Sequence, residues 1–110
     1  MVLVKHGGEK IMVPAKKVPL SSAGLILRTR NTANLLFENP GGENFDLTSW
    51  FVFFPFLVLW LDGKNNVVDS RIARPFEARI KSRRAFSSVL EVPVNERNRE
   101  IIDFFVGGKK

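Results

Sequence analysis

The feature that most constrains this chain is an uninterrupted apolar run of twelve residues, 50–61. A helix that spans a membrane needs about twenty such residues, and Pro55 would break a helix in the middle of this run. As a strand, the run would be apolar on both faces, so both faces must be covered. We therefore predict a central strand, bent or bulged at Pro55, whose cover is a second sheet and a helix or a second subunit.

The aromatic residues of this run have a plain interpretation and a sharper one. The plain interpretation is a hydrophobic core, because burying each Phe or Leu side chain contributes about 1.5–3 kcal/mol. The sharper interpretation is a pocket for a hydrophobic ligand or a face at which two copies meet. The sequence leaves both open, and we keep a homodimer through the aromatic strand as a prediction about partners.

The length and composition are those of one domain, which we place at residues 1–110. Hydrophobic residues make up 45% of the chain, which is enough material for a core. The absence of cysteine excludes a disulfide framework and a Cys nucleophile, and it agrees with a cytoplasmic location. The apolar residues at the N-terminus are too few for a signal peptide, so we expect none.

Outside the apolar run, the pattern predicts further strands. Gly- and Asn-rich turns divide the chain into short pieces, and between them apolar residues recur with period two. We predict strands over residues 10–18, 72–80 and 86–94 and a hairpin over 57–73. The first of these should bend at Pro14 and lie near a sheet edge.

Two charged residues of these strands have expected surroundings. Arg74 shares the parity of Ile72 and Phe76, so we expect it to be partly buried or at a strand edge. It would then need a carboxylate, with Glu38 and Glu91 as candidates. Glu91 itself lies opposite an apolar parity and is expected on a solvated strand face.

One helix is predicted near the end of the chain, over residues 96–105. Asn95 is a favourable N-cap, and the apolar residues after it recur on one helical face. A shorter helical turn is expected near residues 21–27. The fold class is therefore mainly β, a compact β-sandwich or barrel-like domain with one or two short helices.

Several short segments resemble those of a known family, in the same order along the chain. They are residues 22–28 (SAGLILR), 35–38 (LLFE), 51–62 (FVFFPFLVLWLD), 67–68 (VV), 74–76 (RPF) and 89–93 (VLEVP). Together they resemble the domain of unknown function 192 family in its short archaeal-like form, over about residues 15–95. The resemblance implies a compact β-sandwich or barrel with short helices, and it implies no established activity.

The chain departs from this family in places that bear on function. Leu57 stands where family members usually carry an Asp, and residues 48–52 replace a polar stretch that many members carry. The polar groups of a shared pocket are thus mostly missing. Asn65 stands where the family's turn has a Gly, but Asn tolerates the left-handed conformation, so we expect the turn to survive.

Residues for catalysis are few. His6 is the only histidine, and it lies near the N-terminus, so a histidine cluster for zinc is excluded. No phosphate-binding loop or nucleophile elbow occurs, and we predict no cofactor or metal. The candidate pocket carboxylates are Glu38, Asp62 and Glu91, of which Asp62 is most simply a turn residue.

Basic residues are concentrated in one segment. The net charge is +6, which favours polyanionic partners such as nucleic acid. A stripe of such residues can contact phosphates, or it can protect an edge strand from pairing with another chain. The candidate residues for an anionic ligand are Arg71, Arg74, Arg79, Lys81, Arg83 and Arg84, with Arg28 and Arg30 as a second group.

The sequence thus predicts a small non-enzymatic binding or interaction module of unknown ligand. The first alternative is a nucleic-acid-binding accessory protein that uses the basic segment 71–84. The second alternative is a carboxylate-based enzyme. The missing catalytic residues and the dominant apolar run favour the non-enzymatic binding or interaction module over both alternatives.

Overall fold

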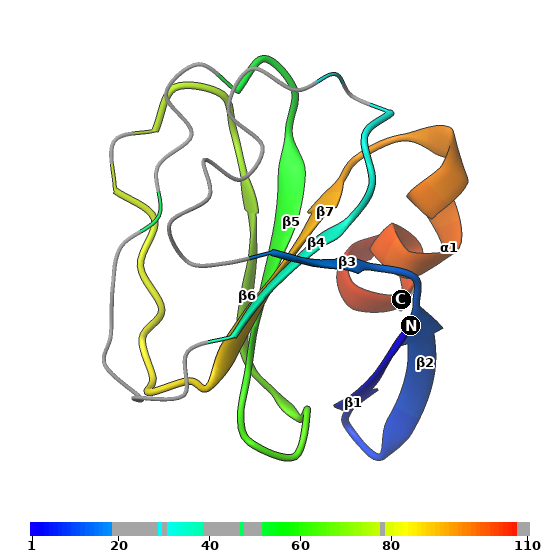
Figure 1. Ribbon diagram of the computed structural model, residues 1–110, viewed down its shortest axis with the longest axis vertical. Helices are drawn as coiled ribbons and strands as arrows, with labels where there is room; N and C mark the ends of the chain where they lie inside the picture. The colour runs from blue at the N-terminus through cyan, green and yellow to red at the C-terminus, as the bar shows by residue number, and fades with distance from the viewer. Residues whose placement is uncertain (19–28, 30, 39–46, 48–51, 78, 108–110) are drawn as a thin grey trace.

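The computed structural model describes residues 1–18, 29, 31–38, 47, 52–77 and 79–107, and Figure 1 shows their arrangement. The described elements, in chain order, are β1 (Val2–His6), β2 (Glu9–Val13), β3 (Lys16–Val18), β4 (Leu35–Glu38), β5 (Phe56–Leu61), β6 (Val67–Ala73), β7 (Ser88–Pro93), a 3-10 turn (Glu96–Asn98), α1 (Arg99–Ile102) and a π-helical turn (Asp103–Gly107).

Among the described residues, a five-stranded sheet with the order β3-β4-β7-β5-β6 forms the centre of the molecule. β3 runs parallel to β4, and the other neighbouring pairs are antiparallel. β1 and β2 form a separate antiparallel hairpin. This hairpin and the C-terminal helical segment lie together on one side of the large sheet (Figure 1). The predicted mainly-β domain with a short helix is confirmed.

β5 is apolar and buried on both of its faces, as predicted for the apolar run. Phe56, Val58 and Trp60 pack into one apolar cluster, which also contains Ile80 and Phe86 from the connection that follows β6. The alternate residues of the strand, all leucines, pack into a second cluster on the opposite face. The strand is therefore a shared wall between two halves of the core.

The second cluster is covered by the β1–β2 hairpin and by the helical segment. Val4 and Val13 come from the hairpin, and Ile101 and Phe105 come from the C-terminal residues. The predicted cover of a second sheet and a helix is thus confirmed for this face. Because every side chain of β5 is buried within one chain, a homodimer would need other residues at its interface, and it stays a prediction.

The apolar run departs from the predicted strand at its N-terminal end. β5 begins only after Pro55, whose nitrogen has no hydrogen to donate. Phe53 lies before this point, and 59% of its surface is exposed. The register irregularity of β5 lies between Trp60 and Leu61. The chain bends at Phe54, next to Pro55, so the predicted bend is confirmed, but it lies just before the strand and not within it.

The turn between β5 and β6 has the predicted form. The Asp62 carboxylate accepts hydrogen bonds from the backbone N–H groups of Lys64 at 2.8 Å and Asn66 at 2.9 Å. Asn65 has a φ of 66°, the left-handed conformation that Asn tolerates. The hairpin over residues 57–73 and the turn role of Asp62 are both confirmed.

The strand predicted over residues 72–80 is wrong beyond Ala73, where β6 ends. Pro75 has no N–H for a ladder, and Phe76 adopts a positive φ of 65°, which turns the chain. Pairing resumes only at a single bridge between Ile80 and Leu47. Arg74 lies in this turn and is exposed, so its predicted partial burial is also wrong.

The solvated position predicted for Glu91 is wrong as well. Only 4% of its surface is exposed, because β7 lies between β4 and β5 with both faces covered. Glu91 lies opposite Leu35 on β4 and opposite Val58 on β5. Both neighbours belong to the first apolar cluster, so the carboxyl group lies on an apolar sheet face.

The two ends of the chain follow their predictions with small differences. The segment predicted as one bent strand over 10–18 is divided near Pro14 into β2 and β3, and β3 lies at the edge of the large sheet. The Asn95 side chain accepts a hydrogen bond from the Asn98 N–H at 2.9 Å, so it is the predicted N-cap. The helical turn expected near residues 21–27 lies outside the described residues.

In the described part of the chain, no helix has the length and apolar character needed to cross a membrane.

Candidate functional site

The basic segment 71–84 does not form one continuous stripe. Arg71 lies on β6, and its Nη2 forms an ion pair with Oε1 of Glu77. Oε2 of Glu77 accepts a hydrogen bond from the Arg74 backbone N–H at 2.7 Å. The Glu77 carboxylate therefore closes the turn after β6 and pairs with Arg71, so Arg71 has a structural role.

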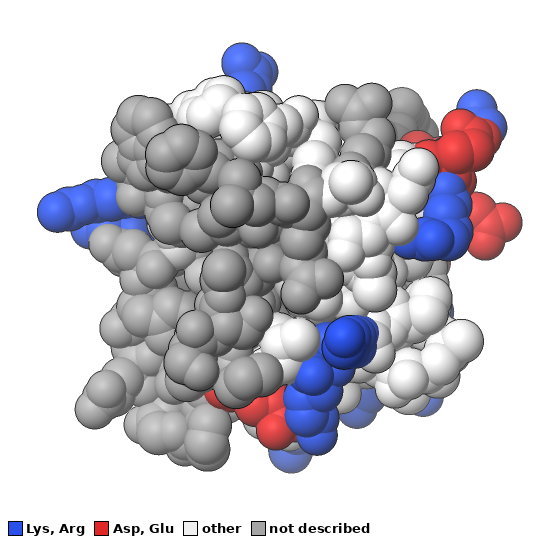
Figure 2. Space-filling view, turned by 45° about the horizontal axis from the view of Figure 1, so that its top comes forward, with Lys and Arg blue, Asp and Glu red and all other residues white. Residues whose placement is uncertain are grey.

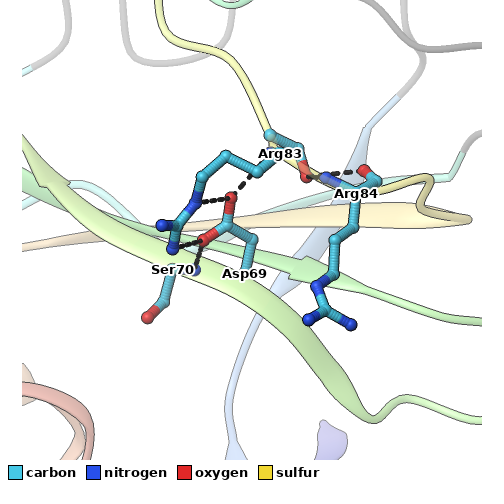
Figure 3. Close-up of polar contacts among 5 residues, drawn as sticks. Asp69, Ser70, Arg83 and Arg84 are labelled. Atoms are coloured by element: carbon cyan, nitrogen blue, oxygen red, sulfur yellow. Dashed lines mark hydrogen bonds and ion pairs between the residues drawn. The ribbon is translucent and has the colours of Figure 1, made fainter.

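Arg83 is held by a second carboxylate, that of Asp69 on β6 (Figure 3). Its Nη2 lies 2.9 Å from Asp69 Oδ1, and its backbone N–H donates to Oδ2 at 2.8 Å. The Ser70 N–H donates to Oδ1 at 2.9 Å. Only 6% of the Asp69 side chain is exposed, against 86% of the Arg83 side chain. The arginine is thus anchored by a buried acceptor while most of its surface stays in solvent.

Burial and hydrogen bonding act in opposite directions on Asp69. Burial raises the pKa of the Asp69 carboxyl group, because it disfavours the charged form. The hydrogen bonds from Arg83 and Ser70 favour the charged form and outweigh burial, so the pKa lies below the ordinary value. The same contact raises the pKa of Arg83. The pair is therefore charged at neutral pH.

Three other basic residues of the segment differ from Arg71 and Arg83. We call them the basic triplet: Arg79, Lys81 and Arg84. All three are exposed, and no carboxylate of the described residues forms an ion pair with them. In Figure 3 the Arg84 guanidinium points away from Asp69. Figure 2 shows basic side chains that project from the left side of the molecule, where Figure 1 places the connection between β6 and β7.

The backbone around the basic triplet is fixed at several points. Ile80 is fully buried and exchanges two backbone hydrogen bonds with Leu47, at 2.8 and 2.9 Å. Arg79 and Lys81 flank this anchor, so their side chains are turned outward. Ser82 Oγ donates to the Arg84 carbonyl at 2.6 Å and accepts from the Arg84 N–H at 3.0 Å. The cations are therefore carried by an ordered segment.

An exposed aromatic pair lies at the start of the same connection. The rings of Phe53 and Phe76 lie with centroids 5.3 Å apart and planes at 79°, an edge-to-face contact. They leave 59% and 45% of their surfaces exposed. From the sequence, Phe76 and Phe86 are the aromatic residues of the basic stretch that could stack on a single strand, whereas Phe53 is expected inside a buried strand. Pro55 is the residue in the sequence that indicates the exposure of Phe53, because the strand begins only after this proline.

The three candidate carboxylates are not brought together. Glu38 lies at the end of β4, exposed, with its Oε2 3.4 Å from Lys17 Nζ. Its register partner Ser88 is three residues from Glu91 along β7, about 10 Å in a strand, and the odd spacing places the two glutamates on opposite sheet faces. Asp62 is used by its turn. No group of three metal-ligating side chains occurs within the described ranges.

A hollow of about 320 Å³ lies at the other end of the sheet, near the start of β3 and the helical segment. Its two charged lining residues, Lys16 and Arg97, are both basic. Arg97 Nη2 donates to the carbonyls of Asn31 and Thr32, each at 2.8 Å. Arg97 thus holds the chain that leads into β4, and these contacts give it a structural role.

Arg28 and Arg30, the second basic group predicted from the sequence, lie outside the described residues.

Comparison with known proteins adds the fold and nothing more specific. No family model matches the sequence, and no curated protein matches it. A protein of unknown function from Novosphingobium aromaticivorans DSM 12444 is similar in structure, with a TM-score of 0.72, 12% identity and coverage of 90% of this chain and 74% of that chain. A protein from Sinorhizobium meliloti 1021, described as a "putative transcription regulator", has a TM-score of 0.65, 22% identity and coverage of 90% and 81%.

Proposed function

We propose that this protein is a non-enzymatic binding module whose ligand is nucleic acid, bound by the basic triplet. The observation that carries the proposal is the contrast between the two kinds of cation in segment 71–84. Arg71 and Arg83 are held by carboxylates, whereas Arg79, Lys81 and Arg84 project into solvent with no described carboxylate beside them. Cations in this state can neutralise phosphates and release the counterions bound there.

The alternative role, protection of an edge strand, fits a different residue. β6 is an edge of the large sheet, and Arg71 is the basic residue that lies on it. The basic triplet lies beyond β6, on the connection to β7. Its charges therefore do not guard the exposed backbone of β6 in the way that charged residues on an edge strand do.

Two further proposals accompany this one without adding a ligand. Membership of the domain of unknown function 192 family rests on the short segments quoted above, and it would bring no established activity. A cytoplasmic location rests on the absence of cysteine. A carboxylate-based enzyme is the less favoured function, since Glu38 and Glu91 lie on opposite faces of the sheet.

The test is a titration of fluorescein-labelled oligonucleotides, followed by anisotropy at low and at moderate salt. The affinity should fall as salt rises, with a slope of about 0.7–0.9 in log K per phosphate contacted. The triple variant Arg79→Ala/Lys81→Ala/Arg84→Ala should bind more weakly and show a smaller slope. The matched control is Lys10→Ala/Lys64→Ala/Arg99→Ala, which changes the net charge equally at exposed sites elsewhere.

Two results would end the proposal. One is the absence of binding at low salt by the wild-type protein. The other is an equal loss of affinity in the control triple variant, because the effect would then reflect net charge and not the basic triplet.

A further inference from the structure

Phe76 occupies a position that neither backbone conformation nor burial explains. Its φ of 65° lies in the left-handed region, which a bulky side chain rarely adopts and which Gly enters without steric cost. Its ring leaves 45% of its surface exposed, so it gains only part of the free energy of burial. The edge-to-face contact with Phe53 offsets part of this cost, and a strained backbone that carries an exposed ring suggests a functional use for that ring.

The ring is also presented in an ordered way. Phe53, its edge-to-face partner, is flanked by Val52 and Phe54, whose side chains lie in the core with 1% and 2% of their surfaces exposed. On the other side, the turn that carries Phe76 is closed by Glu77, which binds the Arg74 N–H and Arg71. The two rings therefore stand on anchored backbone and form a small aromatic platform at the surface.

The surroundings of this platform are cationic. Arg74 precedes Phe76 and Arg79 follows it, while Arg71 and Glu77 form an ion pair with each other. Beyond Arg79, the connection continues to Lys81 and Arg84, at most about 29 Å from Phe76 along an extended chain. The surface thus offers cations for phosphates and aromatic rings for bases, within the length of a short oligonucleotide.

Resting on the proposed function, we infer that the ligand is single-stranded nucleic acid, with a base stacked on Phe76 and Phe53 and the phosphates along the basic triplet. Bases of a single strand expose their faces to aromatic side chains, whereas bases inside a duplex are stacked on one another. An aromatic platform next to exposed cations is therefore matched to a single strand and not to a duplex or to an acidic protein surface. The preference should depend little on sequence, because every base has a stacking face.

The experiment compares three labelled probes at low salt: a 12-nucleotide oligothymidylate, an abasic 12-mer with the same phosphates, and a 12-base-pair duplex. The wild-type protein should bind the oligothymidylate about tenfold more tightly than the abasic strand. Phe76→Gly should remove most of this difference and leave duplex and abasic binding unchanged. The variant should stay folded, because Gly relieves the backbone conformation and thereby offsets part of the lost contact with Phe53; its melting temperature checks this.

Two further variants keep the test independent of one substitution. Phe76→Asn tolerates the same backbone conformation and should behave as Phe76→Gly does. Met12→Ala removes another exposed apolar side chain, 50% exposed and on β2, and should bind all three probes as the wild type does.

The outcomes separate this inference from the proposed function. Should the folded Phe76 variants prefer the oligothymidylate as strongly as the wild type does, the stacking inference is overturned while phosphate binding by the basic triplet stands. Equal wild-type affinity for the oligothymidylate and the abasic strand overturns it in the same way. If the wild type binds none of the three probes, the proposed function fails and this inference fails with it.

Discussion

Asn34 and Asn98 exchange side-chain amide hydrogen bonds across 64 positions of the chain, at 2.9 Å and 3.2 Å. The remaining amide hydrogens bind backbone carbonyls, that of Asn34 to Pro14 at 2.7 Å and that of Asn98 to Pro93 at 2.8 Å. Both residues are buried. The pair therefore joins the β2–β3 connection, the start of β4, the end of β7 and the C-terminal helical segment.

We expect Asn98→Ala to lower the free energy of unfolding by about 2 kcal/mol or more. The substitution leaves Asn34 Oδ1 and the Pro93 carbonyl without their amide donor, and each buried polar group without a partner costs about 1–3 kcal/mol. Urea denaturation followed by tryptophan fluorescence measures the change. Asn31→Ala is the matched control, because Asn31 is exposed. A loss below 0.5 kcal/mol, taken as about the scatter of surface substitutions, would contradict the role of this pair.

The Asp69–Arg83 ion pair predicts a defined dependence of stability on pH. The pKa of Asp69 is lower in the folded protein than its ordinary value of 3.8. The stability that the charged carboxylate contributes is therefore fully present above pH 3.8. The contribution is lost as the pH falls through the folded-state pKa. At pH 7, Asp69→Asn should be less stable than the wild type by about 1–3 kcal/mol. The two proteins should converge as the pH falls below 3.8 and through the folded-state pKa of Asp69.

Urea denaturation at pH 7, 4 and 2.5 measures this convergence. Asp103→Asn is the control, since Asp103 is exposed and no described ion pair includes it. A difference between Asp69→Asn and the wild type that stays constant down to pH 2.5 would show that the carboxylate charge is not what stabilises this contact.

The β5–β6 turn can be tested through Asn65, whose φ is 66°. Asn65→Gly should keep the stability of the wild type, because Gly adopts this conformation freely. Asn65→Ala should lower the free energy of unfolding by about 1–2 kcal/mol through the steric cost of the left-handed region. Thermal unfolding of both variants, with Lys64→Ala as a control in the same turn, gives the comparison. Equal stability of the Gly and Ala variants would contradict the assigned conformation.

The parts of the fold that were predicted correctly depend on local patterns. The two apolar parities of β5 follow from alternation along a single strand, and the cap at Asn95 and the turn at Asp62 each involve residues at most four positions apart. Such features follow from the chain near them, whatever the rest of the molecule does.

The errors concern features that depend on distant neighbours. Glu91 lies on a strand whose alternation suggested a solvated face, and only the order of the sheet places covered strands on both sides of it. Arg83 reaches Asp69, 14 positions earlier, because the chain turns back after Pro75. The exposure of Phe53 likewise depends on where β5 begins. Pairing order and chain reversal are set by the whole core, so period-two patterns do not reveal them.

The N-cap of the C-terminal helix and the buried amide pair should act together. Asn95 Oδ1 accepts the Asn98 N–H at 2.9 Å, and the Asn98 side chain binds Asn34, so one residue belongs to both contacts. Asn95→Ala should cost about 1 kcal/mol, while Asn95→Asp should retain the cap and place a favourable charge at the helix N-terminus. A double-mutant cycle of Asn95→Ala with Asn98→Ala, measured by urea denaturation, should give a coupling energy of at least 0.5 kcal/mol, as expected for residues in one hydrogen-bond network. Strict additivity of the two substitutions would mean that the cap and the amide pair stabilise the helical segment independently, which would contradict the proposed coupling.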